Sequence, residues 1–332
     1  MSKVFPPIGR RRVLQGAAAG VVTLGLLLWW LLPLGEKPPS GTIVFSTGTP
    51  RGVYQEYGER LRTELGRDMP GLKVKLLRSA GSQENIQRVA TGQADFTIAA
   101  ADAVAAYGLR NGTGAGRLRG VARLYDDYVH LIVRRDSDIT SVADLRHKRV
   151  ATGLPDSGVR LIADRVLRAA GIDPRKDLTP VSEGIDTGPG RLQQRKIDAF
   201  FWSGGLPTKG LVALAEQAAF RFVPIDDGLV TRLHGAGEGA RYYRSTNIPE
   251  SAYPAVQQGA QVPTVAVSNL LMTRSDMDPR LTEWVTRTVI KSRDGIGAHV
   301  HSAQLVDLRT AIYTDPLPLQ AGARRYYRSM KP

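Results

Sequence analysis

The sequence predicts an α/β protein built from two similar lobes that are joined by crossing strands. Within residues 42–102, a short apolar strand, a polar loop and a helix follow one another three times. A second series of the same kind begins at residue 149. Two long apolar and β-branched segments, 129–134 and 264–272, stand before and after this second series, where strands that cross between the lobes are expected.

The first series opens the predicted globular part. Residues 43–45 are β-branched or aromatic, and residues 47–52 form a loop with Gly and Pro. Apolar side chains then recur at helical spacing, at Tyr54, Tyr57, Leu61 and Leu65. Two more strands, at 74–77 and 96–99, also end in polar loops that precede helices. Helix N-termini at the carboxyl edge of a parallel sheet form a crevice that suits a small anion.

The rest of the chain supplies the second lobe and the return to the first. A helix opens within GLPDSGVR, residues 153–160, and a later one begins at Lys209. Asp278 is expected to cap the helix that follows the return strand, and Tyr326 and Tyr327 to pack on the first lobe. Further strands are predicted at 118–124, 149–152, 178–181, 199–202 and 220–225. We assign segments 41–130 and 265–332 to lobe 1, and segment 131–264 to lobe 2.

Residues 1–40 look like an export signal or membrane anchor with its linker. Arg10 and Arg11 with the apolar residues after them resemble a twin-arginine signal, although adjacent arginines also suit the general secretion route. Residues 17–34 are uncharged and about long enough to span a bilayer. Neither an Ala-x-Ala site nor a cysteine follows them. We therefore expect an uncleaved membrane anchor, with the globular part on the outer face of the cytoplasmic membrane.

Composition argues against several classes of function. The formal charge of +14 is spread along the chain, whereas nucleic-acid binding calls for a clustered basic stripe. The absence of cysteine removes disulfides, Cys-ligated zinc and thiol nucleophiles. The histidines form no metal-ligand motif, and the acidic pair Asp126 and Asp127 is expected in a solvated turn. We expect no nucleic-acid partner and no enzyme, and name no cofactor or metal ligand.

The candidate ligand contacts lie at strand ends and helix starts beside the predicted crevice. Arg51 precedes a helix N-terminus and can hold a carboxylate bidentately, although a surface arginine is the alternative. Trp202 ends a strand, where its ring can cover a solute or pack in the core. Packing or helix capping is the alternative for most of the others, which are Thr49, Tyr54, Ser82, Asn85, Asp102, Ser157 and Arg160.

Several motifs occur in a fixed order, namely TGTPRGVY, AGSQEN, GQADFTIAAAD, LYDDYVHLIVRRDS, KIDAFFWSGGLP and PTVAVSNLLMTR. Over residues 42–327 they resemble the extracytoplasmic solute receptors of TRAP transporters, TAXI family. This resemblance implies a type II periplasmic-binding-protein fold, closure on a small acidic solute such as glutamate or another carboxylate, and TRAP membrane subunits as partners. Arg51 in the first loop and Ala100 and Ala101 before Asp102 depart from the family pattern, so the identity of the ligand carries over less well than the class of function.

We therefore expect an exported solute-binding protein. On closure, Arg51 and Ser82 from lobe 1 should meet the same solute as Ser157 and Arg160 from lobe 2. The alternative is a membrane-anchored sensor that reports its ligand to a signalling partner.

Overall fold

The computed structural model describes residue 23 and residues 36–235 and 237–331. Residues 39–332 form one compact unit, which is described below. Almost all of the predicted signal or anchor, residues 1–40, lies outside the described residues. Among the residues that are described, no helix is long and apolar enough to cross a membrane.

A single mixed sheet runs through the compact unit. Its strands follow the order β2 (Leu72–Leu77), β1 (Gly41–Ser46), β3 (Phe96–Ala100), β10 (Val262–Arg274), β4 (Leu118–Arg134), β7 (Ala199–Gly204), β5 (Arg149–Ala151) and β6 (Thr179–Val181). Two further strands, β8 (Phe220–Phe222) and β9 (Tyr243–Ile248), pair with β4 and β10. Each end of the sheet contains parallel strands, β2, β1 and β3 at one end and β7, β5 and β6 at the other.

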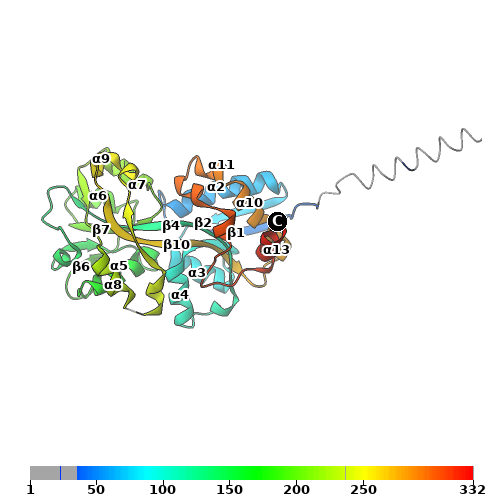
Figure 1. Cartoon of the computed structure of the whole chain (residues 1–332), viewed down its shortest axis with the longest axis horizontal. Coiled ribbons are helices and arrows are strands. Elements are labelled where there is room, and N and C mark those ends of the chain that lie inside the picture. Colours follow the sequence, from blue (N-terminus) through cyan, green and yellow to red (C-terminus); the bar gives the residue numbers. More distant parts are fainter. Residues whose placement is uncertain (1–22, 24–35, 236, 332) are drawn as a thin grey trace, which may run out of the picture. The chain divides into compact units, whose positions relative to one another are not determined.

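The long antiparallel strands β4 and β10 lie in the middle of the sheet and connect its two ends (Figure 1). Strand β4 pairs with β10 along its first part and with β7 along residues 128–133. Strand β10 pairs with β9 along residues 262–267 and with β3 along residues 269–272. The two predicted crossing strands are confirmed, but the strands predicted at 118–124 and 129–134 are one continuous strand of 17 residues.

Helices cover both halves of the sheet. In the half that contains β1 they are α2 (Val53–Asp68), α3 (Ser82–Thr91), α4 (Ala101–Leu109), α10 (Pro279–Lys291), α11 (Arg293–Gly297), α12 (Leu308–Ala311) and α13 (Ala321–Ser329). In the half that contains β7 they are α5 (Gly158–Ala169), α6 (Gly188–Gln193), α7 (Lys209–Ala215), α8 (Asp227–His234) and α9 (Pro254–Gln257). Short 3-10 turns are η1 (Ala115–Arg117), η2 (Val142–Leu145), η3 (Glu238–Tyr242), η4 (Glu250–Ala252) and η5 (His301–Leu305).

Separate apolar cores support the two halves. One core packs α5, α7 and α8 on β7 and the second part of β4, with Ile132, Val166 and Phe200 at its centre. Another packs α2, α10 and α13 on β1 and the first part of β4, and a third lies between β3, α3 and α4. As predicted, Asp278 caps α10, and the buried Tyr327 donates a hydrogen bond to the carbonyl of Val121 in β4.

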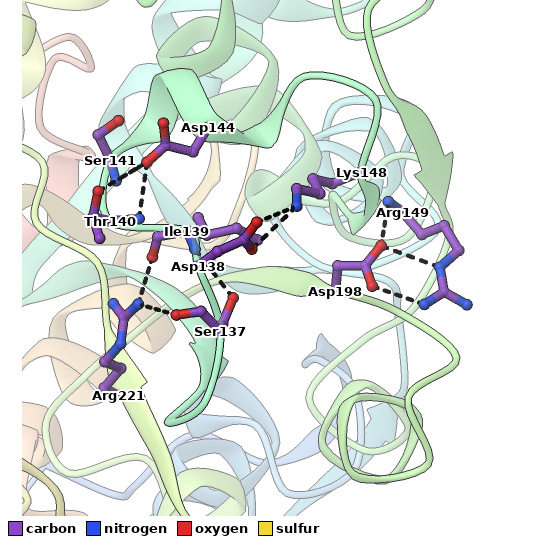
Figure 2. Close-up of polar contacts among 10 residues, drawn as sticks. All are labelled: Ser137, Asp138, Ile139, Thr140, Ser141, Asp144, Lys148, Arg149, Asp198 and Arg221. Atoms are coloured by element: carbon purple, nitrogen blue, oxygen red, sulfur yellow. Dashed lines mark hydrogen bonds and ion pairs between the residues drawn. The ribbon is translucent and has the colours of Figure 1, made fainter.

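The entry into the second half is fixed by local polar contacts (Figure 2). Ser141 and Asp144 form a reciprocal capping box at the start of η2. Asp198, just before β7, holds both the backbone amide and the guanidinium of Arg149 at the start of β5. These contacts set the register of β5 beside β7, which in turn positions the start of α5.

Candidate functional site

A narrow cavity lies between the two halves, at the carboxyl ends of β1, β3 and β7. The space open to the centre of a water molecule is about 40 Å³, enough for about three waters. Its walls come from both predicted lobes and consist of Gly48, Thr49, Gly52, Val53, Tyr54, Ala80, Gly81, Ser82, Ala100, Asp102, Asp127, Gly158, Val159, Ile162, Trp202, Ser203, Gly204 and Val267.

Four helices begin at this cavity. Val53 starts α2, Ser82 starts α3, Asp102 is the second residue of α4, and Gly158 starts α5. The first amides of a helix have no partner inside the helix, and its dipole places partial positive charge at this end. Helix N-termini from both halves therefore present hydrogen-bond donors and positive potential to the same small space.

Glycines let the N-termini of α3 and α5 approach each other. A Cβ atom on Gly158 would lie 2.9 Å from Ser82 Oγ. Gly81, just before α3, has a φ of +137°, which side chains other than glycine rarely adopt. The halves also make direct contacts here, because Gln83 Nε2 donates to the carbonyl of Ser157 at 2.8 Å and the amide of Glu84 donates to the carbonyl of Asp156 at 3.0 Å.

A buried polar cluster forms one wall of the cavity. The Tyr54 hydroxyl donates to Asn269 Oδ1 and lies 3.1 Å from Ser82 Oγ and 3.5 Å from Asp127 Oδ2. Ser82 Oγ also accepts a hydrogen bond from the amide of Ala100 at 3.1 Å. Among the described residues, neither Asp127 Oδ1 nor Asn269 Nδ2 has a hydrogen-bond partner. The cluster thus contains polar atoms that remain available beside the cavity.

Burial changes the acid–base properties of this wall. Asp127 is 3% exposed. Burial, together with the neighbouring carboxylates of Asp126 and Asp102, raises the pKa of its carboxyl from 3.8 to about 7, although hydrogen bonds from Asn269 and Tyr54 act in the opposite direction. Burial and the Asp127 carboxylate likewise raise the pKa of Tyr54, so its hydroxyl stays protonated at neutral pH.

Asp102 joins the two halves beside the cavity. Its carboxylate accepts a hydrogen bond from the Tyr243 hydroxyl at 2.6 Å and lies 3.3 Å from Arg165 Nη1. Arg165 belongs to α5 and also donates to the Tyr243 hydroxyl at 2.8 Å. Burial raises the pKa of Asp102, whereas the Tyr243 hydrogen bond and the Arg165 charge lower it. Asp102 does not occupy the capping position of α4, which belongs to Ala100, and is instead the second residue of the helix.

Five of the predicted contacts, Thr49, Tyr54, Ser82, Asp102 and Trp202, lie together on the cavity wall. Trp202 is largely buried and its indole nitrogen donates to Thr208 Oγ1 at 3.0 Å, which fixes the ring against the cavity. Its position near the end of β7 therefore serves both core packing and the cavity wall.

The other four predicted contacts lie outside the wall. Arg51 is exposed, with a φ of +63°. Asn85 is fully buried and its side chain joins Ser46 to the carbonyls of Thr47 and Ile98.

In the second half, Ser157 caps α5 by accepting from the amide of Arg160. The guanidinium of Arg160 donates to the carbonyl of Gly153 and to Ser182 Oγ. Ser157 and Arg160 thus have structural partners. Contact of Arg51, Asn85, Ser157 and Arg160 with a solute stays a prediction.

The sequence reasoning missed Asp127. It placed the pair Asp126 and Asp127 in a solvated turn, but both residues lie within β4 and Asp127 is buried. Asp126 instead faces Arg123 and Arg244, which hold its pKa below its usual value despite partial burial. The apolar residues on both sides of the pair were the available signal, since a strand continued through them alternates between the two faces of the sheet.

The sequence model of the NMT1-like family matches residues 45–330. The alkanesulfonate-binding protein SsuA from Xanthomonas axonopodis pv. citri bound to MOPS superposes with a TM-score of 0.50 and 15% identity, covering 90% of this chain and 86% of that chain. A putative L-cystine ABC transporter from Listeria monocytogenes also gives a TM-score of 0.50 and 15% identity, covering 80% of this chain and 98% of that chain.

These similarities confirm the predicted fold class, an α/β fold of the periplasmic-binding-protein kind. The two proteins are named for binding an alkanesulfonate and for the transport of L-cystine.

Proposed function

The chain belongs to the NMT1-like family, and from this premise we propose that it is an extracytoplasmic solute-binding protein whose two lobes close on a small carboxylate. The observation that carries the proposal is the meeting of four helix N-termini, from both halves, at one narrow cavity. No Arg or Lys lines this cavity among the described residues. Backbone amides and the hydroxyls of Thr49, Ser82 and Ser203 would therefore hold the anion.

The size of the cavity supports a small solute. Its space of about 40 Å³ holds about three waters, which is enough for a carboxylate group but not for a whole solute, so the walls must separate to admit one. Glutamate and short dicarboxylates, the solutes implied by the motif resemblance, require only a limited separation of the walls.

Closure supplies the proposed mechanism. With the halves apart, the first amides of α3 and α5 face water. A carboxylate that contacts both N-termini stabilises the arrangement in which Gly81 and Gly158 approach each other. The continuous strands β4 and β10 connect the halves, so bending along them would open and close the cavity.

The partner that we propose is a pair of TRAP-type membrane subunits, on the strength of the ordered motifs. Genes for such subunits beside this one would support delivery to a TRAP transporter. Genes for an ABC permease and its ATPase, or for a sensor kinase, would instead favour those partners.

Because residues 17–34 are uncharged, we also propose export with retention of the N-terminal anchor. Full-length protein should then stay in the membrane fraction after a high-salt wash.

Thermal unfolding with a panel of solutes tests the function. Ligand at about a hundred times its dissociation constant stabilises the folded protein by about 2.7 kcal/mol. We expect an increase in the melting temperature with one or more small carboxylates, including glutamate and short dicarboxylates, and none with neutral sugars. A panel in which only sugars raise the melting temperature would overturn the proposal.

A further inference from the structure

The charged side chains on the cavity wall are acidic. Asp102 and Asp127 line the cavity, and no basic side chain does so among the described residues. The two acids differ in their partners. Asp102 is compensated by Arg165 and Tyr243. Asp127 Oδ1, by contrast, has no hydrogen-bond partner in the described part of the chain.

The surroundings of Asp127 offer it no compensating positive charge. The titratable groups that face it are Asp126 and Tyr125 from β4, Tyr54 from α2 and Asp102 from α4, while β10 contributes the neutral amide of Asn269. The nearby cations Arg123, Arg244 and Arg165 are paired with Asp126 and Asp102. A buried carboxylate with no cation beside it is costly, so this side of the cavity favours positive charge and disfavours a second negative charge.

We propose that Asp127 binds a cationic nitrogen of the solute, and therefore that the solute is a carboxylate with a protonated amine, such as an α-amino acid, and not a dicarboxylate. The inference rests on the proposed function and names its substrate class. The solute carboxylate would lie at the N-termini of α3 and α5, and its ammonium group at Asp127 Oδ1. A charge-assisted hydrogen bond between the ammonium and this oxygen would give Asp127 the cationic partner that it lacks.

Binding of the amine is then coupled to the release of a proton from Asp127. Because burial raises the pKa of Asp127 to about 7, the free carboxyl is largely protonated below that pH. The incoming ammonium pairs with the carboxylate, and the displaced proton passes to the solvent. For one linked proton, the affinity falls by about tenfold for each pH unit below pH 7. Above this pH, Asp127 is already ionised and the affinity levels off.

Calorimetric titration of the full-length protein in detergent tests the substrate class with matched pairs of acids. Each pair shares a carbon chain and differs in the amine: L-glutamate and glutarate, L-aspartate and succinate, L-alanine and propionate. We expect the amino acid to bind at least tenfold more tightly than its partner in every pair that binds. The binding amino acid should also release a proton at pH 6, seen as a dependence of the binding heat on the ionisation heat of the buffer.

Two substitutions separate this contact from general effects on the cavity. Asp127→Asn should weaken binding of the amino acid by about tenfold to a hundredfold, abolish its dependence on pH between 5 and 7, and leave binding of the deaminated acid equal or stronger. Asp126→Asn is the matched control, because Asp126 does not line the cavity, and it should keep the preference for the amino acid.

The outcomes distinguish the inference from the proposed function. Deaminated acids that bind as tightly as the amino acids would overturn the inference and leave the function standing. Equal loss of both members of a pair in Asp127→Asn would also overturn it, since a purely structural role for Asp127 weakens both alike. If no carboxylate of either series binds, the proposed function fails, and the inference fails with it.

Discussion

Asp127 shows how one residue can conflict with the pattern around it and thereby mark a site. It lies between largely apolar stretches of β4, and the strand continues through it because β4 pairs with β10 on one side and β7 on the other. Sequence reasoning treated the two aspartates as a break in the strand, since acids are rarely buried without a partner. Only the three-dimensional arrangement shows that Asp127 borders a cavity, so local pattern could not predict its role.

The stability of the protein should depend on pH through Asp127. Its pKa is about 7 in the folded protein and 3.8 in a solvated carboxyl. The folded state therefore keeps a proton that the unfolded state has lost, and the contribution of Asp127 to the free energy of unfolding decreases as pH rises from 4 to 7. Replacing Asp127 by Asn removes this pH-dependent contribution, which is on the order of 4 kcal/mol.

Urea unfolding at several pH values without solute provides the measurement. Relative to the parent, Asp127→Asn should gain stability as pH rises toward 7 and change little above it. A difference between the two proteins that is independent of pH would contradict an elevated pKa at Asp127.

At the scale of elements, the strand, loop and helix units were the most predictable part. Their apolar positions repeat with clear periods, and loops rich in glycine separate them. Strand β9 was not predicted, because its sequence YRSTNI is mostly polar and it forms by pairing with β10. Pairing with a distant strand overrides local preference, which also explains why the two strands predicted around Asp126 are one.

Asn85 illustrates a residue that organises elements and not a solute. Its side chain connects the end of β1, through Ser46 and Thr47, with the carbonyl of Ile98 in β3. Asn85→Ala would leave buried polar groups of both strands without partners, so we expect a loss of about 3 kcal/mol in the free energy of unfolding. Gln87→Ala, at an exposed position of the same helix, should cost little.

Chemical denaturation of the two variants measures these losses directly. If Asn85→Ala leaves stability unchanged but abolishes solute binding, then Asn85 is a ligand contact, as the sequence first suggested.

At the scale of the whole molecule, the sequence indicated where the site lies better than which side chains complete it. The crevice at the carboxyl ends of the strands follows from the α/β topology, and Thr49, Tyr54, Ser82 and Trp202 lie there because they end strands or start helices. The charge balance of the site could not be predicted in this way. It depends on the contact of Asp127 in β4 with Tyr54 and on the contact of Arg165 in α5 with Asp102. Both contacts join residues that lie far apart in the chain.

Gly158 should control closure. A methyl group there would lie 2.9 Å from Ser82 Oγ and 3.2 Å from Ser82 Cβ, so Gly158→Ala keeps the two halves apart without disturbing α5 itself. We expect weaker solute binding and a smaller compaction on adding solute in small-angle scattering. The control is Gly66→Ala in α2, where no heavy atom lies within 4 Å of the added carbon.

Full compaction of Gly158→Ala with its solute would show that the approach of α3 and α5 is not required for closure.

The ion pair between Asp102 and Arg165 has a consequence for the response of the protein to salt. Both side chains are largely buried, at 2% and 18% exposure, and mobile ions screen buried pairs much less than exposed ones. Other ion pairs between the two halves, namely Lys209 with Glu56, Arg244 with Asp126 and Arg241 with Asp315, include strongly exposed side chains. High ionic strength should therefore weaken the exposed ion pairs first and leave the pair between Asp102 and Arg165 intact. The two halves should then stay in contact at salt concentrations that separate proteins held together by surface charges alone.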